Sequence, residues 1–466
     1  MKVPARSRGS AQLRAQRSMV TRRWVLPSQA FLHAEAPGGL ILLAASLLAM
    51  VLANSPAAEP VSQFWETRWS FGAGRFTLRG DLRELVNDGL MSVFFFVAGL
   101  EIKREMIKGQ LSSARRAAFP VVAALGGMIA PALLYVGLNL GGAGVHGWGI
   151  PMATDIAFSI GVLSLLGRRV PGSARTFLLA LAIADDIGAI VVIAVFYSSE
   201  IHFDPMFVAG AIWVTIMAMN EYGFRSAPLK LAVSLAFWAS VRASGIHPTI
   251  AGVILGVSTP IRPWFNIEAS SVWTRRLALK LAGAVAANRT NRAEAILGKI
   301  EVLSRETESP LDRQLRKFHP WSSWVILPLF ALANSGVSLS GGSLGQASRS
   351  VITWGIMAGL ILGKPLGIIS FAWMASRLGW ASAPRGLNFR GVVGVGIVAG
   401  IGFTVSLFIA DLAFDAPHQV VEAKLGVLAA SVTSGALGYA FLRLATDGTR
   451  MKHGSAGERS FRKPGV

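Results

Sequence analysis

The sequence predicts an all-α polytopic membrane protein with about twelve transmembrane helices. Hydrophobic residues make up 52% of its 466 residues and charged residues only 15%, whereas soluble proteins carry about 25% charged residues. The hydrophobic residues also gather in runs that are long enough to cross a bilayer as helices. A transmembrane β-barrel would instead show alternating segments of about 10 residues. Composition and run length together therefore favour a helical bundle in a membrane.

The hydrophobic runs divide the chain into helices and loops. They lie near 38–55, 85–100, 117–140, 149–166, 176–198, 206–220, 229–243, 247–260, 322–338, 350–375, 391–413 and 420–443. An even number of spans places both termini on one side of the membrane. The termini and the loops on their side hold about 37 Lys and Arg residues, against about five in the opposite loops. Because cytoplasmic loops carry the excess of basic residues, we expect both termini in the cytoplasm.

Three regions follow from this pattern. Residues 1–30 are basic and rich in serine and predict a flexible cytoplasmic N-terminus. Residues 31–443 form the transmembrane domain, and 444–466 form a basic cytoplasmic tail. The longest outer loop, WETRWSFGAGRFTLRG at 65–80, predicts a short periplasmic β-hairpin. Its exposed edge strands could pair between two subunits, which would make a homodimer.

The longest inner loop, 261–320, predicts an amphipathic helix. Apolar and charged residues alternate there at helical spacing; they are Ile296, Ile300 and Leu303, with Arg292, Glu294, Lys299, Arg305 and Glu306. Such a helix fits the cytoplasm or the membrane interface. A solvated charged helix without a partner explains the pattern equally well.

Composition also excludes several classes of function. The chain has no cysteine, which excludes disulfides, thiolate metal sites and cysteine nucleophiles. Its formal charge of +20 is spread over loops and termini rather than gathered on one face. That placement argues against a nucleic-acid partner.

The most informative feature is a pair of carboxylates inside a hydrophobic run. Asp185 and Asp186 lie in the middle of TFLLALAIADDIGAIVVIAVFY, 176–197. Each would cost about 2.5–3.5 kcal/mol at the centre of a membrane helix, so such residues usually face a wet cavity and mark an ion or proton path. Neighbours on a helix point about 100° apart, so the two carboxylates cannot play the same role. Together they predict a site that holds protons or a small cation such as sodium; the alternative is a permanently protonated structural pair.

Two further charges lie deep in predicted spans. Asp155 follows Thr154 in GIPMATDIAFSIGVLSLLG, and Lys364 lies in LILGKPLGIIS. The glycine-rich run at 391–414 is either a closely packed helix or a discontinuous helix that lines a cavity. If broken helices meet end to end, Asp155 could balance their positive N-termini and Lys364 their negative C-termini.

Weaker candidates lie near the ends of the spans. Asp88 is expected near an outer mouth, and Glu101 and Glu105 near the inner end of the same helix. His247 begins another hydrophobic run, and histidine is suited to sensing pH. The charged cluster is equally well explained as a solvated helix end, and a lone histidine at the start of a helix is more often a polar cap.

Eight motifs together resemble NhaA-type bacterial sodium/proton antiporters. They run in order from about residue 31 to 443 and are NDGLMSVFFFVAGLEIKRE, ATDIAFSIGVLSLLG, LALAIADDIGAIVV, SGIHPTIAGVILG, HPWSSWVILPLFALANSGVSL, LILGKPLGI, GIGFTVSLFIADLAF and AKLG. The resemblance implies an inner-membrane transporter with an inverted-repeat fold and two discontinuous helices that cross at mid-membrane. It implies electrogenic export of Na⁺ or Li⁺ in exchange for protons, with a role in pH and sodium homeostasis and no cofactor.

The resemblance also implies roles for individual residues. Asp186 and Asp185 would bind the cation, with Asp186 as the more direct ligand and Thr154 as a helper. Lys364 would pair with Asp185 and take part in proton exchange, and Asp155 would compensate charge at the crossing. The positions associated with the cation path or with pH response are Asp88, Glu101, Glu105 and His247.

One position departs from the family pattern. Four residues before His319, where the family commonly carries an acidic residue, this chain has Leu315. Two other classes of membrane protein also use buried carboxylates. An intramembrane aspartyl protease needs carboxyls that meet across two helices, and an acid-lined cation channel would be obstructed by an internal lysine.

Overall fold

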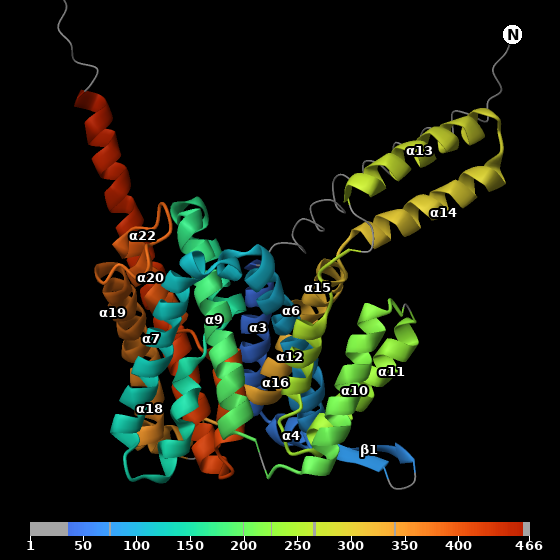
Figure 1. Ribbon diagram of the computed structural model, residues 1–466. Coiled ribbons are helices and arrows are strands. Elements are labelled where there is room, and N and C mark those ends of the chain that lie inside the picture. The colour runs from blue at the N-terminus through green and yellow to red at the C-terminus, as the bar shows by residue number, and fades with distance from the viewer. Residues whose placement is uncertain are drawn as a thin grey trace, which may run out of the picture.

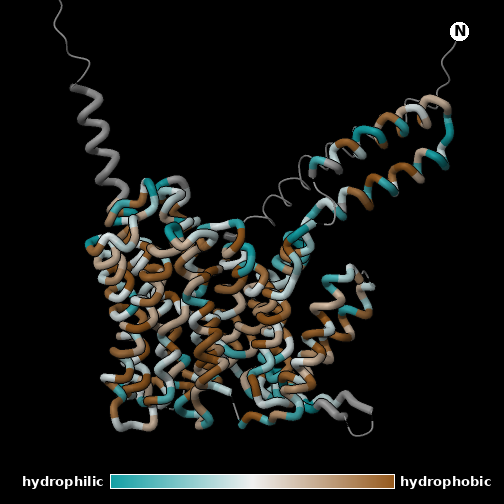
Figure 2. Tube along the Cα trace, in the orientation of Figure 1, coloured by the Kyte–Doolittle hydropathy of each residue, from teal (hydrophilic) through white to brown (hydrophobic). Residues whose placement is uncertain are grey.

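The computed structural model describes residues 36–73, 76–198, 200–224, 226–263, 267–339 and 342–459. The predicted flexible segment 1–30 lies outside these residues. The described part of the chain is a bundle of helices with one small two-stranded sheet (Figure 1). Figure 2 shows hydrophobic residues along the length of the bundle helices.

The first half of the chain contains both strands. Its elements are α3 (Ala36–Ala53), α4 (Ala58–Trp65), β1 (Arg68–Ala73), β2 (Phe76–Asp81), α5 (Leu82–Glu84), η2 (Leu85–Leu90), α6 (Met91–Lys108), η3 (Gln110–Ser112), α7 (Ala114–Asn139), η4 (Ala143–Met152), α8 (Ile156–Leu165), η5 (Gly167–Arg169), α9 (Gly172–Phe196), α10 (Phe203–Glu221), α11 (Ala227–Ala243) and α12 (Thr249–Ser258). The strands pair antiparallel with Arg68 opposite Asp81, which confirms the predicted hairpin.

Within the described residues, the second half contains helices and connecting loops but no strand. Its elements are α13 (Ile267–Ala286), α14 (Thr290–Thr307), α15 (Pro310–Trp321), η6 (Ser322–Ile326), α16 (Leu327–Asn334), α17 (Ser343–Arg349), α18 (Val351–Ala358), η7 (Gly359–Gly363), α19 (Lys364–Arg377), α20 (Phe389–Ala399), α21 (Phe403–Ala413) and α22 (Pro417–Arg459). The last helix continues through most of the predicted tail, 444–466. The loop 261–320 holds three helices where the sequence pattern predicted one.

Each of the predicted hydrophobic runs is helical, but the runs differ in length. Six continuous helical segments in the described residues are long and apolar enough to cross a membrane; they are Leu82–Lys108, Ala114–Asn139, Gly172–Phe196, Phe203–Glu221, Val351–Arg377 and Pro417–Ala445. Three pairs of helices qualify only when joined across a bend, which raises the number to nine. Runs such as α12, with 10 residues, are shorter than the roughly 20 residues that a perpendicular span needs.

Two of the bent pairs follow the same order of elements. In one, the long helix α7 precedes the pair η4 and α8 and the long helix α9 follows it. In the other, the helical segment α18–α19 precedes the pair α20 and α21 and the long helix α22 follows it. The bends measure 48° and 44° respectively. The segments 114–196 and 351–445 thus share one order of a long helical segment, a bent pair and a second long helix.

Glycine allows the long helices α7 and α19 to pack closely. A Cβ atom on Gly367 would lie 2.0 Å from the carbonyl oxygen of Gly126, so any larger residue would force these helices apart. A π-helical segment, η7, immediately precedes Lys364 on α19. Such segments shift the face that the next residues present and are frequent at functional sites. Close packing and this shift together bring Lys364 to the two bent pairs.

Candidate functional site

The breaks in the two bent pairs contact each other. The first lies between η4 and α8 and the second between α20 and α21. The backbone N–H of Asp155 donates to the carbonyl of Ile401 over 2.7 Å. The hydroxyl of Thr154 donates to the carbonyl of Ala399 over 3.1 Å, and that of Ser159 to Val398 over 3.3 Å. Residues at and just after the first break therefore donate to carbonyls at the C-terminal end of α20 and in the second break, where the regular intrahelical donors run out.

The carboxylate of Asp155 joins the N-termini of two helices. One oxygen accepts from the backbone N–H of Phe158 at 2.9 Å and caps α8. The other accepts from the backbone N–H of Thr404 at 3.1 Å and from its hydroxyl at 2.6 Å, at the start of α21. Helix N-termini carry partial positive charge, so the buried carboxylate lies where its negative charge is electrostatically favoured.

Lys364 lies at the opposite kind of helix end. Its side chain is fully buried, and its ammonium group donates to the carbonyl of Met152, the last residue of η4. The ammonium is also 3.0 Å from Oδ2 of Asp185. The ammonium group therefore lies against both the C-terminal end of η4 and the carboxylate of Asp185, a position suited to compensating both.

The two neighbouring carboxylates on α9 have different surroundings. Asp185 is fully buried, and its Oδ2 accepts from the hydroxyl of Thr154 at 2.7 Å as well as pairing with Lys364. Its Oδ1 has no hydrogen-bond partner within the described residues. Asp186 is 8% exposed and faces a cavity. The helical twist explains the difference, because successive side chains point about 100° apart.

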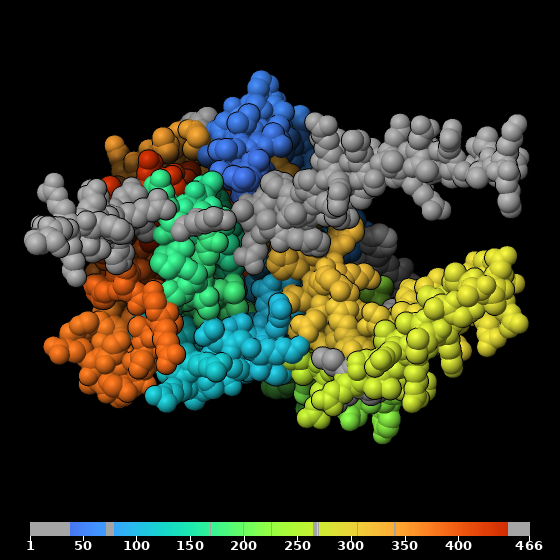
Figure 3. Space-filling view, turned by 90° about the horizontal axis from the view of Figure 1, so that it is seen from above, coloured from blue at the N-terminus to red at the C-terminus, as the bar shows by residue number. Residues whose placement is uncertain are grey.

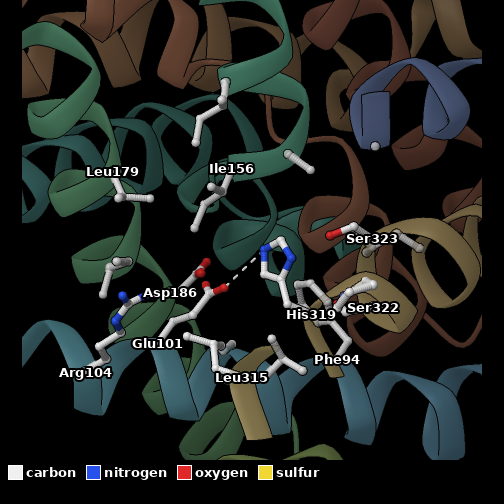
Figure 4. Close-up of a pocket in the computed structure, with 18 of the residues that line it drawn as sticks. Phe94, Glu101, Arg104, Ile156, Leu179, Asp186, Leu315, His319, Ser322 and Ser323 are labelled. Atoms are coloured by element: carbon white, nitrogen blue, oxygen red, sulfur yellow. Dashed lines mark ion pairs between the residues drawn. The ribbon is translucent and has the colours of Figure 1, made fainter. Parts of the chain in front are cut away.

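The cavity reaches from Asp186 to the end of α6. Its volume is about 560 Å³, and Figure 4 shows Asp186 and Glu101 projecting into it. Thr154, Asp155 and Glu105 also line it. His319 on α15 lies on the opposite wall, with Nε2 3.6 Å from Oε1 of Glu101. The structure thus brings Glu101 and Glu105 into the same cavity as Asp186 and Thr154, whereas Asp185 lies behind its wall.

An ion-pair cluster at the mouth of the cavity was missed by the sequence reasoning. Asp312 on α15 lies 2.7 Å from Nζ of Lys108 and 3.5 Å from Nε of Arg104, both on α6. Partial burial acts to raise the pKa of Asp312, but hydrogen bonds from Lys108 and Ser309 and the charges of Lys108 and Arg104 outweigh it and hold the pKa below its usual value. Helical spacing is a signal that could have pointed to Asp312. It lies three residues before Leu315, so the two side chains lie on the same face of the helix.

Leu315, the position that departs from the family pattern, is largely buried at the same mouth. It is 8% exposed and packs in one cluster with Val97 and Leu100 of α6. Figure 4 shows it on the wall of the cavity near Glu101. An apolar contact between α15 and α6 therefore takes the place where the family commonly has an acid.

Asp88 and His247 meet each other, but not the cavity. Oδ1 of Asp88 lies 3.8 Å from Nε2 of His247 and its Oδ2 lies 3.6 Å from Arg242, which also pairs with Glu84. Asp88 and Glu101 lie thirteen residues apart along one helical segment, or about 20 Å along its axis. The structure therefore separates the four weaker candidates into two pairs, one at each end of this segment. Arg242, which joins the outer pair, was missed because a lone arginine at a helix end gives no signal.

Comparison with known proteins fits this geometry. The family model described as Na⁺/H⁺ antiporter 1 matches residues 29–442. The chain belongs to the Na⁺/H⁺ antiporter 1 family. A relative named Na⁺/H⁺ antiporter NhaA 2, from Sorangium cellulosum, is 45% identical over 424 residues, or 91% of each chain. A relative with the same name from Myxococcus xanthus is 46% identical over 406 residues, 87% of this chain and 86% of its own.

A third relative extends the match. The Na⁺/H⁺ antiporter NhaA of a Janthinobacterium species is 42% identical over 443 residues, 94% of this chain and 97% of its own. Membership of the Na⁺/H⁺ antiporter 1 family thus covers both bent pairs, Asp185, Asp186 and Lys364. All three relatives are named as antiporters, not as enzymes or channels.

Proposed function

We propose that this protein is a secondary active transporter that exports Na⁺ or Li⁺ across the bacterial inner membrane in exchange for protons. The family and the printed names of the relatives support Na⁺/H⁺ exchange. The observation that carries the proposal is the position of Asp186, which faces a cavity while Asp185 behind it is paired with a buried lysine. Such exchange serves pH and sodium homeostasis.

The cation is proposed to bind at Asp186 and Asp185, with help from the hydroxyl of Thr154. Small hard cations prefer carboxylate and hydroxyl oxygens. Oδ1 of Asp185 lacks a hydrogen-bond partner among the described residues, so it is available to a cation. A cation beside Asp185 would compete electrostatically with the ammonium of Lys364. Release of a proton from Lys364 or from Asp186 as the cation binds would therefore couple the movement of the cation to the movement of protons.

Exchange requires that cation and protons occupy the site in turn. If protons bind from one side and the cation from the other, the site must alternate between two accessible states. Transport is electrogenic if more positive charge crosses the membrane in one direction than in the other. The membrane potential then contributes about 2.3 kcal/mol per net charge per 100 mV. No step of this cycle needs a bound cofactor.

We also propose how the helices cross the membrane and how two subunits pair. The twelve helical runs would cross the membrane as an inverted repeat, with the two bent pairs crossing near mid-membrane. The excess of basic residues in alternate loops supports cytoplasmic termini and places the mouth at Glu101 on the cytoplasmic side. The antiparallel hairpin β1–β2 would pair two subunits, and the remaining partners are lipid and ions, not nucleic acid.

The acid-lined channel has no specific observation in its favour. Lys364 is fully buried and within 3.0 Å of Asp185, and a channel that conducts cations gains nothing from a cation fixed at its ion site. The relatives are named as antiporters. Those names also fit a protein that is not an enzyme.

Acid-loaded inside-out vesicles with a pH-sensitive dye test the proposal. Sodium addition should dissipate the proton gradient with the wild-type protein and fail to do so with Asp186→Asn. The matched control is Asp204→Asn, on the exposed first turn of α10, which should behave as wild type. Equal responses from Asp186→Asn and the control would reject the assignment of the cation site.

A further inference from the structure

The segment η4, the first half of one bent pair, is an unusually long 3₁₀ helix. It runs over ten residues, Ala143–Met152, whereas such helices seldom exceed roughly 3–4 residues because their hydrogen bonds are poorly aligned. A 3₁₀ helix rises about 2.0 Å per residue and an α-helix about 1.5 Å, so the same segment wound as an α-helix would be about 5 Å shorter. The winding of η4 therefore affects where Thr154, just beyond its end, comes to lie.

Side chains of neighbouring helices bind carbonyl groups along η4. The hydroxyl of Tyr135 on α7 donates to the carbonyl of Gly144 over 2.7 Å. The hydroxyl of Ser406 on α21 donates to the carbonyl of Ile150 over 2.7 Å. Both side chains are fully buried. These contacts support a winding that the hydrogen bonds within η4 support poorly.

Tyr197, at the end of α9, binds two backbone groups of η4. Its hydroxyl donates to the carbonyl of His146 over 2.7 Å and accepts from the backbone N–H of Gly149 over 3.2 Å. A carbonyl and an N–H three residues apart are the partners in a 3₁₀ helix, whereas in an α-helix each would turn to a partner four residues away. The hydroxyl of Tyr197 is therefore placed to favour the 3₁₀ winding of η4 over the α-helical one.

The residues next to this contact fit it. A Cβ atom on Gly149 would lie 2.9 Å from the hydroxyl oxygen of Tyr197, so a larger residue there would push the tyrosine ring away. Trp148 on η4 packs edge to face with Phe196 on α9, with ring centroids 5.0 Å apart. Two adjacent residues of η4 thus contact two adjacent residues at the end of α9.

The same two elements meet again at the ion site, where the hydroxyl of Thr154 donates to Oδ2 of Asp185. Asp185 lies twelve residues before Tyr197 on α9, or about 18 Å along the helix axis. His146 and Thr154 lie eight residues apart, which is about 16 Å at the rise of a 3₁₀ helix and about 12 Å at that of an α-helix. The 3₁₀ length is the closer match to the separation of the two contacts on α9.

The contact of Tyr197 with η4 lies far from the mouth of the cavity. Figure 1 shows α9 running through the bundle and ending near the level of β1. Figure 3 views the opposite end, from which α13 and α14 project sideways. The cavity opens between α6 and α15 at that opposite end. Tyr197 therefore reaches the ion site through η4 and not through the cavity.

We propose that Tyr197 is a positioning residue of the exchange site, which holds η4 in its 3₁₀ winding and so places the hydroxyl of Thr154 on Asp185. The inference rests on the proposed function, in which Thr154 and Asp185 help to bind the cation. Without the hydroxyl of Tyr197, η4 can shorten and draw Thr154 away from Asp185. The carboxylates remain in place, so the site loses the order of its ligands but not its charge. Such a loss weakens cation binding more than it slows the bound site.

The variant Tyr197→Phe in reconstituted vesicles tests the proposal. The KM for sodium should rise by about 10-fold, the weight of one or two hydrogen bonds, while the maximal rate stays within about twofold of wild type. The matched control is Tyr222→Phe at the end of α10, where the side chain is 81% exposed, and its KM should equal that of wild type. An unchanged KM in Tyr197→Phe would overturn the proposal, and so would a reduced maximal rate at the wild-type KM, which would indicate a purely structural role.

A second variant tests the contact itself. Gly149→Ala displaces the tyrosine ring and should raise the KM for sodium as Tyr197→Phe does. The double variant should be no worse than either single variant, because both changes remove one contact. Effects on KM that multiply in the double variant would overturn the proposal, since the two residues would then act independently.

Binding measured without transport separates this inference from the proposed function. Sodium that binds the folded protein raises its melting temperature in detergent, and Tyr197→Phe should need about 10-fold more sodium for the same rise. If sodium stabilises the wild type but vesicles show no exchange, the proposed function fails and the positioning role stands. If vesicles exchange and the sodium dependence of melting is the same in both proteins, the positioning role fails and the proposed function stands.

Discussion

Asp185 and Lys364 form an ion pair of 3.0 Å in which both side chains are fully buried. Each of these buried charges is stable only because the other is present, since removal of either one leaves the other without compensation. Thr154 and the carbonyl of Met152 complete the polar surroundings of the pair.

Lys364→Ala should lower the free energy of unfolding by about 3–5 kcal/mol, the usual cost of breaking a buried ion pair. A thermal unfolding curve in detergent measures this as a reduced melting temperature. The matched control is Lys424→Ala, which breaks the more accessible pair between Lys424 and Asp411, at 2.7 Å. A larger loss of stability in the control would show that the pair of Lys364 and Asp185 is not the stronger structural contact.

Asp155→Ala should destabilise the protein by about 2 kcal/mol or more, since a lost N-cap costs roughly 1 kcal/mol and this carboxylate serves the first turns of both α8 and α21. Thr404→Val removes only the hydroxyl bond to the same carboxylate and should cost about 1 kcal/mol. Thermal unfolding of both variants checks the order. Equal losses would mean that Asp155 supports only one of the two helices.

The contact between Asp312 and Lys108 should be sensitive to acid. Because the pKa of Asp312 in the folded protein is held below its usual value, its contribution to stability is present above the unfolded pKa of about 3.9 and is lost as the pH falls through the folded pKa. The pair is partly exposed, with side chains 50% and 28% accessible, so the contribution should be below about 1 kcal/mol. A double-mutant cycle with Asp312→Asn and Lys108→Gln, measured near neutral pH and again in acid, should give a coupling that disappears in acid. A coupling that persists there would contradict this account.

Leu315→Glu should shift the pH dependence of exchange to higher pH. The new carboxylate would face the cavity close to Glu101, and carboxylates near one another resist joint ionisation. The measurement is the initial rate of sodium-dependent proton release as a function of pH, with Leu315→Gln as a neutral control of similar size. An unchanged profile would remove Leu315 as a determinant of pH response.

Much of the arrangement could be predicted from residue type and depth alone. Charges of both signs within hydrophobic runs have few stable positions, so Asp155 could be assigned to helix N-termini and Lys364 to a C-terminus and a carboxylate. The helical twist predicted different surroundings for Asp185 and Asp186, whereas the choice of Asp186 as the more direct ligand was implied only by the family resemblance. What remained out of reach was the contact of Asp88 with His247 and Arg242, because these residues come from segments whose relative positions depend on packing.

The neighbouring helices α13 and α14 show a second limit of sequence patterns. Ile296, Ile300 and Leu303 predicted an amphipathic helix, and these residues do lie in a helix, α14, but the pattern cannot tell which neighbouring surface contacts it. In the structure that surface is α13, whose mixture of exposed apolar and basic residues has a weaker periodicity. The prediction of the number of membrane spans has a similar limit, because the length of a hydrophobic run does not show whether it is a bent pair or a short helix.

The shared carboxylate of Asp155 constrains how the transporter can move. Separating the two breaks would leave the amide of Thr404, the amide of Asp155 and the carbonyl of Ile401 without these partners, and each unsatisfied group costs several kcal/mol away from water. A motion that keeps the breaks together avoids that cost. These hydrogen bonds tie α8, α20 and α21 together, and a movement of these three helices as a unit against α6 and α15, which also line the cavity, would leave the bonds intact.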